Sequence, residues 1–169
     1  TLGTLTIPRA WISTDVKMRG KTFRFFCRAQ DQSQLMGQQG PSGRCPPEFC
    51  RIMAEEIGAS QLWAQFNVGA SANLLREAAA LTTQIKGETI PTDKLGAFSL
   101  TLRQPVGTVL SIVPWNGPVI LGARAIAYPL ACGNTVIFKG SENSPRTHAL
   151  VADAFIEAGL PAGVLNFLI

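Results

Sequence analysis

The spacing of apolar and polar residues changes along the chain, and each change marks a predicted element. The first 47 residues show no regular period, and residues 30–50 are rich in Gln, Gly, Pro and Ser. We therefore expect residues 1–47 to form an irregular basic arm outside the fold. A helix is predicted over residues 48–57, and Ser60 is expected to cap a longer helix. Apolar residues recur every three or four positions in this second helix and predict one buried stripe, formed by Leu62, Phe66, Ala70, Leu74, Ala78 and Leu81.

Beyond residue 87 the pattern becomes that of strands separated by helices. A period of two at Phe98, Leu100 and Leu102 is typical of a half-exposed strand. Three later apolar runs predict buried parallel strands, at residues 108–113, 135–138 and 164–168.

Helix signals fill the two intervals between these runs. Pro118 is expected at an early position of the first helix, which ends near Leu130 and is stopped by Gly133. Pro145 begins the second helix, and Gly159 is expected just beyond its end. The alternation of strand and helix with short connections predicts an α/β fold, namely part of a right-handed doubly wound parallel sheet.

The net charge of +4 is unevenly distributed. Residues 1–51 contain eight Lys/Arg and three Asp/Glu, a balance of +5, whereas residues 52–169 contain seven and eight, a balance of −1. The basic residues are scattered and lack the pattern of a nucleic-acid-binding module, so a nucleic-acid partner is not expected. Residues 105–123 are uncharged but are interrupted by three Pro and three Gly, so no membrane-spanning helix is expected either.

Signals for targeting and metal binding are weak. The first 30 residues lack the apolar core and cleavage site of a secretory signal, so a cytoplasmic location is expected. The same residues are basic and poor in acids, which leaves a mitochondrial presequence open. The four cysteines show neither a disulfide framework nor zinc-ligand spacing, and no metal site is predicted. The one histidine, His148, is expected on the exposed first turn of a helix.

Polar side chains follow the ends of two predicted strands. Asn116 comes after the first strand, and Lys139 and Glu142 come after the second. Ligands of such sheets bind beyond the carboxyl ends of the strands, so these residues indicate a nucleotide-binding α/β unit. No glycine-rich phosphate loop or Walker sequence supports this interpretation. Two structural alternatives stay open: Asn116 as a helix cap, and Lys139 with Glu142 as an ordinary exposed ion pair.

Several separate motifs lie between residues 52 and 168, at spacings that are typical of one protein family. They comprise residues 103–107, Pro114-Trp115-Asn116, residues 129–136, Lys139, Ser141-Glu142, Pro145 and residues 157–164. In these motifs the chain closely resembles the N-terminal part of the NAD(P)-dependent aldehyde dehydrogenase superfamily. Residues 121–127 are most similar to the salicylaldehyde and vanillin-type aromatic aldehyde dehydrogenases.

The resemblance implies a Rossmann-like cofactor-binding domain over residues 48–169. It implies an enzyme that oxidises an aldehyde, aromatic in this group, to a carboxylic acid with NAD(P), and NAD is expected rather than NADP. The strand at Phe98, Leu100 and Leu102 resembles the family's oligomerisation hairpin, which implies a homo-oligomer.

The resemblance also implies roles for single residues. Asn116 would donate its side-chain N–H to the oxyanion of the thiohemiacetal formed when an enzyme cysteine attacks the aldehyde. Lys139 and Glu142 would bind the ribose hydroxyls on the adenosine side of the cofactor. The wall on the nicotinamide side would consist of Val113, Pro114 and Trp115.

The chain departs from the family pattern in several places. Ala125 stands where many members have a Lys, with Arg124 beside it, and Cys132 matches a buried helix end. The glycine-rich turn at the pyrophosphate, the general-base Glu and the nucleophilic Cys follow the third strand in the family, and none is in this chain. We therefore expect a truncated part of an aldehyde-oxidising enzyme, inactive on its own. The alternative is a catalytically dead interaction module or a non-functional truncated product.

Overall fold

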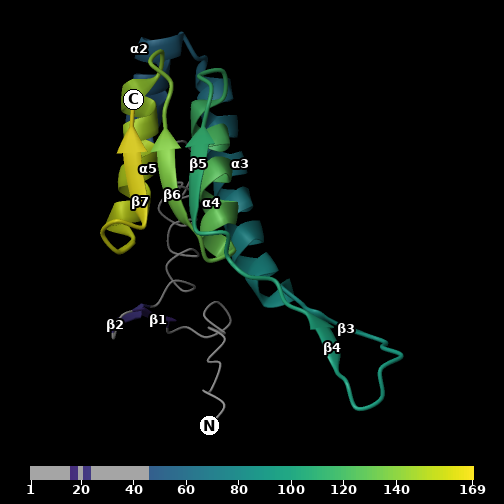
Figure 1. Cartoon of the computed structure of the whole chain (residues 1–169). Coiled ribbons are helices and arrows are strands. Elements are labelled where there is room, and N and C mark those ends of the chain that lie inside the picture. Colours follow the sequence, from purple (N-terminus) through teal and green to yellow (C-terminus); the bar gives the residue numbers. More distant parts are fainter. Residues whose placement is uncertain (1–15, 19–20, 24–45) are drawn as a thin grey trace.

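A three-stranded parallel sheet forms the centre of the fold in this computed structural model (Figure 1). Its strands lie in chain order, β5 (Thr108–Ile112), β6 (Thr135–Lys139) and β7 (Leu165–Leu168). Helix α4 (Pro118–Ala131) connects β5 to β6, and helix α5 (Pro145–Glu157) connects β6 to β7. The predicted α/β fold, with one part of a doubly wound parallel sheet, is confirmed.

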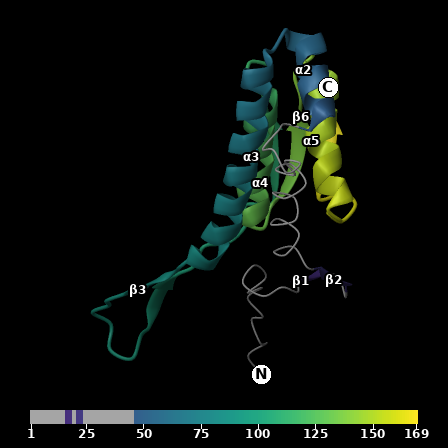
Figure 2. The ribbon, with the colours of Figure 1, turned by 180° about the vertical axis from the view of Figure 1, so that it is seen from behind.

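Both connecting helices lie on the same face of the sheet, as the view from behind shows (Figure 2). Right-handed connections between strands in sequential order place successive helices on one side. On this covered face the central strand β6 contributes the fully buried Val136 and Phe138. Leu110 and Ile112 of β5 are exposed. The prediction of a buried strand at residues 108–113 is therefore correct for one face only, because the described helices cover one side of the sheet.

Helix α3 (Gln61–Leu81) packs along α4 through small residues. Small side chains let two helix backbones approach closely, and the buried residues of α3 are Ala64, Asn67, Val68, Ser71, Ala72, Leu75, Ala78 and Ala79. The predicted stripe is wrong for its largest members, since Leu62 is 76% exposed and Phe66 is 54% exposed. The apolar period alone did not reveal that α3 turns its small residues toward its partner.

A β-hairpin extends away from the body of the fold (Figure 1). It pairs β3 (Glu88–Ile90) with β4 (Ser99–Thr101) in antiparallel register. A single turn of 3-10 helix (Thr82–Gln84) precedes it. The predicted strand is confirmed, but its half-burial is not, because Phe98, Leu100 and Leu102 are all exposed.

The structure describes residues 16–18, 21–23 and 46–169, with side chains from residue 46 onward. The first two pieces are β1 (Val16–Met18) and β2 (Lys21–Phe23), which form an antiparallel pair. Most of the predicted arm, residues 1–47, lies outside the described residues. Within the described part, no helix is long and apolar enough to cross a membrane, and no cluster of metal-ligand side chains is present. Cys50 is disulfide-bonded, which the cysteine spacing did not predict.

The N-termini of α4 and α5 are completed by side chains from other helices. Neither helix has a side-chain bond from its own N-cap residue. Asn67 Oδ1 in α3 accepts a hydrogen bond from Ile120 N at 3.4 Å. Glu56, in helix α2 (Pro47–Ile57), accepts from Arg146 N at 2.7 Å, Thr147 N at 2.9 Å and Thr147 Oγ1 at 2.6 Å. These contacts satisfy first-turn N–H groups that have no partner within their helix.

Ser60 caps α3 as predicted, because its Oγ accepts from Trp63 N at 3.2 Å. In contrast, the expectation of an exposed His148 is wrong. The residue is 0% exposed, and its ring contacts Phe138 edge-on at 5.4 Å between centroids. Burial lowers the pKa of His148 from 6.5 to about 4, against the opposing effect of the Glu56 carboxylate. The ring is therefore neutral at physiological pH.

Replacing Glu56 by Ala should lower the free energy of unfolding by about 1–3 kcal/mol, because two first-turn N–H groups of α5 lose their acceptor. Glu55→Ala is the matched control on the same helix. Among the described residues, the Glu55 carboxylate forms ion pairs with the exposed Arg51 and Arg146, so its loss should have little effect. Chemical denaturation of both variants measures the difference, and equal losses would contradict the capping role.

The buried histidine predicts a dependence of stability on pH. Between pH 6.5 and about 4 the unfolded chain binds a proton at His148 that the folded chain does not. The contribution of the neutral His148 to the free energy of unfolding should therefore be complete above pH 6.5. As the pH drops toward 4, the free energy of unfolding should fall by up to about 1.4 kcal/mol per pH unit. Glu56 and Lys139 are the charged groups that act on the ring.

His148→Asn should flatten this slope, because the chain contains no other histidine. Denaturation curves between pH 7 and pH 5 are the measurement. This interval lies above the usual range of carboxyl groups, so their titration contributes little. An identical slope in the variant would show that the imidazole does not titrate differently in the two states.

Candidate functional site

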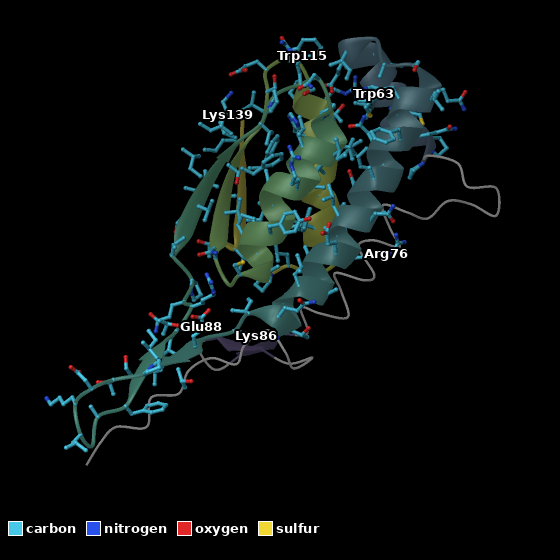
Figure 3. All side chains as sticks on the ribbon, turned by 90° about the vertical axis from the view of Figure 1, so that its right-hand side faces the viewer. Trp63, Arg76, Lys86, Glu88, Trp115 and Lys139 are labelled. Carbon is cyan, nitrogen blue, oxygen red and sulfur yellow. The ribbon has the colours of Figure 1, made fainter. Side chains whose placement is uncertain are left out.

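The carboxyl ends of β5 and β6 lie side by side and carry the predicted site residues. Val113 N donates to the Lys139 carbonyl oxygen at 3.1 Å, which continues the strand pairing past the end of β5. The 113–117 turn and the 139–144 loop therefore begin at the same edge of the sheet. Figure 3 shows Trp115, Lys139 and Trp63 toward this end, whereas Lys86 and Glu88 mark the opposite end, where the hairpin begins.

Asn116 is exposed on the turn between β5 and α4. Its backbone carbonyl accepts a hydrogen bond from Trp63 Nε1 at 3.1 Å. Its side chain makes no hydrogen bond to any described residue, and the N-cap of α4 is Gly117. The alternative of Asn116 as a helix cap is therefore not supported. Its amide is left free to contact a ligand.

Helix α3 holds this turn at two points. Trp63 binds the Asn116 carbonyl, and Asn67 accepts from Ile120 N in the first turn of α4. Asn67 is fully buried, and its own Nδ2 donates to the Trp63 carbonyl at 3.1 Å. A Cβ added at Gly117 would lie 3.5 Å from Asn67 Oδ1 and 3.1 Å from the Ile120 side chain. The turn is thus packed against α3.

Lys139 and Glu142 meet on the loop after β6. The Lys139 ammonium contacts the Glu142 carboxylate, and the two side chains are 29% and 72% exposed. The hydrogen bond from Lys139 lowers the pKa of Glu142, so the carboxylate is ionised at neutral pH. Lys139 and Glu142 therefore form the ion pair that the sequence offers as the structural alternative to a ligand site. The same two groups, a donor and an ionised acceptor, are also suited to a pair of neighbouring hydroxyls.

Backbone contacts order the middle of this loop. Ser141 N donates to His148 Nδ1 at 3.0 Å, and Ser144 N donates to the Ser141 carbonyl at 3.1 Å. Asn143 N donates to Ser141 Oγ at 3.3 Å. Glu142 is thereby placed on a short loop that is held by bonds within the loop and by His148 of α5.

The remaining wall residues differ in exposure. Val113 is buried, whereas Pro114 and Trp115 are exposed at the same edge of the sheet. Arg124 is exposed on α4, and Ala125 is half-buried, with its carbonyl accepting from Ser111 Oγ at 2.8 Å.

Cys132 does not belong to this site. The expectation of a buried position is wrong, since Cys132 is exposed. It follows the last turn of α4, whereas Asn116 precedes the first turn. A helix of this length separates its ends by about 20 Å at the standard rise per residue. Cys132 therefore cannot act beside Asn116.

Four positions that order the site were not predicted from the sequence. They are Glu56, Trp63, Asn67 and His148, and all four act through backbone groups of distant residues. A polar residue among small buried ones was an available signal for Asn67. Glu56 gave no such signal, because an acidic residue near a helix end is ordinary.

Known proteins resemble this chain over the same region. A salicylaldehyde dehydrogenase of Pseudomonas putida is 70% identical over 122 residues, which are 72% of this chain and 25% of the relative. A vanillin dehydrogenase of Pseudomonas fluorescens is 56% identical over 115 residues, which are 68% of this chain and 24% of the relative. The chain thus spans about a quarter of the length of these relatives.

Solved structures also resemble this chain over the same region. The crystal structure of a salicylaldehyde dehydrogenase from Pseudomonas putida G7, complexed with salicylaldehyde, superposes with a TM-score of 0.74 at 62% identity, covering 83% of this chain and 28% of that one. An NAD-dependent benzaldehyde dehydrogenase of Corynebacterium glutamicum superposes with a TM-score of 0.76 at 27% identity, covering 85% of this chain and 30% of that one. An NADP-dependent enzyme of E. coli superposes with a TM-score of 0.74 at 26% identity, covering 85% of this chain and 29% of that one.

These similarities confirm the resemblance seen in the sequence, down to the group of salicylaldehyde and vanillin dehydrogenases. Structures that match this chain include both NAD- and NADP-dependent enzymes. The sequence profile of the aldehyde dehydrogenase family matches residues 45–169, which is most of the chain. The chain therefore belongs to the aldehyde dehydrogenase family.

Proposed function

We propose that the protein carrying this segment oxidises an aromatic aldehyde to its carboxylic acid, with NAD as the acceptor and water as the source of the second oxygen. The observation that supports this most is the exposed Asn116 amide, whose side chain makes no hydrogen bond to a described residue, at the same sheet edge as the Lys139–Glu142 pair. Residues 46–169 supply one side of the site. The nucleophile and the base belong to other parts of the complete enzyme.

Asn116 acts on the oxygen of the aldehyde. As a nucleophile adds to the carbonyl carbon, this oxygen gains negative charge, and the amide N–H of Asn116 donates a hydrogen bond to it. The turn needs no reorganisation for this, because Trp63 holds the carbonyl of Asn116 and Asn67 holds the first turn of α4 that follows. Such a fixed donor stabilises the transition state more than the ground state.

Lys139 and Glu142 hold the adenosine ribose. Each of two neighbouring hydroxyls can donate to the ionised Glu142 carboxylate, and Lys139 can donate to a hydroxyl oxygen. The residues present therefore fit the group. Pro114 and Trp115, with backbone from the buried Val113, would form the wall on the nicotinamide side. A bound nicotinamide would supply the acceptor for the hydride that leaves the substrate carbon.

An acidic ribose ligand favours NAD over NADP. A carboxylate repels the 2′-phosphate that distinguishes NADP, whereas it binds a free 2′-hydroxyl. The proposal of an aromatic substrate is supported by relatives named for salicylaldehyde and vanillin and by the complex with salicylaldehyde. We further propose a cytoplasmic location, where the nicotinamide cofactors are abundant.

The hairpin supports assembly into a homo-oligomer. Phe98, Leu100 and Leu102 are exposed on a two-stranded sheet that extends away from the body. Exposed apolar strands of this kind are suited to pairing with another copy. A module that only assembles through this hairpin is the alternative function. Replacement of Asn116 separates the two proposals, because such a module has no activity to lose.

In the complete enzyme, Asn116→Ala should lower kcat by about 10²–10³-fold, as the loss of one oxyanion donor does. The KM for NAD should change little. Steady-state kinetics with an aromatic aldehyde provide the measurement, and Asn143→Ala, another exposed asparagine at this edge, is the control. An intact kcat accompanied by a lower melting temperature would show that Asn116 is structural.

Glu142→Gln should narrow the preference for NAD over NADP, with kcat/KM for NAD falling about tenfold through the loss of charge-assisted hydrogen bonds. The exposed Glu157, at the far end of α5, provides the matched control Glu157→Gln. The ratio of kcat/KM for the two cofactors is the readout. If this ratio is the same in both variants and the parent, Glu142 does not contact the ribose.

A further inference from the structure

The ring of His148 packs directly against the backbone of the 139–144 loop. Its Nδ1 accepts from Ser141 N at 3.0 Å, and Ser144 Oγ lies 3.3 Å from the same nitrogen. A Cβ added at Gly140 would lie only 3.0 Å from Nδ1. The ring therefore contacts the loop on both sides of Glu142, at residues that come shortly before and after it.

Accepting these bonds requires one chemical form of the imidazole. Nδ1 is an acceptor only when the ring is neutral and carries its proton on Nε2. The ring is fully buried, and burial lowers its pKa to about 4, so this form persists across the physiological range. The Ser141 N–H is itself buried and would have no acceptor without it.

Packing alone does not explain a histidine at this position. Nε2 makes no hydrogen bond of good geometry among the described residues, and the weaker backbone hydrogen bond with Pro118 raises the pKa of the ring by less than burial lowers it. A buried donor without a well-formed hydrogen bond is destabilising, and a leucine of similar size would avoid it. The histidine is therefore accounted for by its acceptor, Nδ1, and by the loop that this atom holds.

We propose that His148 is a positioning residue for the cofactor site, acting through the 139–144 loop. The proposal rests on the proposed function of Lys139 and Glu142 as ribose ligands. The Glu142 side chain is 72% exposed and has Lys139 as its side-chain partner, so its place depends on the backbone around it. His148 fixes that loop at the Ser141 backbone N–H and at the Ser144 hydroxyl, and with it the spacing between the carboxylate and the end of β6.

Two substitutions separate the acceptor from the volume of the ring. His148→Leu fills the space but leaves Ser141 N–H without a partner. His148→Asn places its Oδ1 where Nδ1 lies in histidine and retains an acceptor. Val151→Ala removes buried volume from the same helix at a position that makes no hydrogen bond to Ser141, and so controls for general destabilisation.

The complete enzyme is the material for three measurements. Hydrogen–deuterium exchange reports on the Ser141 amide. Steady-state kinetics give the KM for NAD, which is compared with kcat and with the KM for the aldehyde. Nitrogen NMR of labelled histidine gives the tautomer of the His148 ring. We expect His148→Leu to speed Ser141 exchange and to raise the KM for NAD about tenfold with kcat nearly unchanged. His148→Asn should remain close to the parent in Ser141 exchange and in the KM for NAD. Val151→Ala should lower only the melting temperature.

Several results would overturn the inference. One is a KM for NAD that rises equally in His148→Leu and Val151→Ala, which would indicate general destabilisation. Another is failure of His148→Asn to restore Ser141 protection. If His148→Leu does not fold, the parent enzyme still decides the matter, because a ring protonated on Nδ1 cannot accept from Ser141.

Glu142→Gln distinguishes this inference from the proposed function. If that variant leaves the KM for NAD unchanged, Glu142 is not a ribose ligand and the proposed function of the loop fails. If Glu142→Gln raises the KM and His148→Leu does not, only the role of His148 fails. When both are correct, the double variant should raise the KM by less than the product of the two single effects.

Discussion

The carboxylate of Glu56 completes the N-terminus of α5 from ninety residues away in the chain. Helix α5 starts at Pro145 without a cap of its own, and the N–H groups of its first turn need an acceptor. Since Glu56 lies in the last turns of α2, this contact places α2 against α5. Helix α3 then begins after a short turn and lies along α4, where Asn67 performs the same task for the first turn of that helix. Two helices outside the sheet unit therefore determine how its two connecting helices begin.

This arrangement affects where a dinucleotide can be held. In many doubly wound sheets the phosphates lie at a helix N-terminus, bound by free N–H groups. Here first-turn donors of α4 and α5 are already used by Asn67 and Glu56, so a phosphate at either end would have to displace a bound side chain. The chain also has no glycine-rich phosphate loop after β5. The proposed binding of the ribose by Lys139 and Glu142 does not use these helix ends.

Much of the sheet unit could be predicted because its signals are local. Apolar runs, Pro at the first helical position and Gly after the last one mark β5 to β7 with their helices to within a few residues. The position of the candidate residues Asn116, Lys139 and Glu142 at one sheet edge followed from the rule for strand ends, whereas their roles stay predictions. The face of α3 and the burial of His148 could not be read in this way. Both depend on which neighbour a helix packs against, and that is decided by residues far along the chain.

The two bonds from α3 to the Asn116 turn depend on the helical period. Trp63 and Asn67 stand four residues apart, one turn of helix, and reach the turn together. One residue inserted between them would rotate one side chain by about 100° relative to the other and break that alignment. The loop joining β3 to β4 has no comparable restriction, because it extends into solvent beyond the body of the fold. Variation in length among homologous chains is therefore expected to accumulate in this connecting loop, while the first turns of α3 keep a constant number of residues.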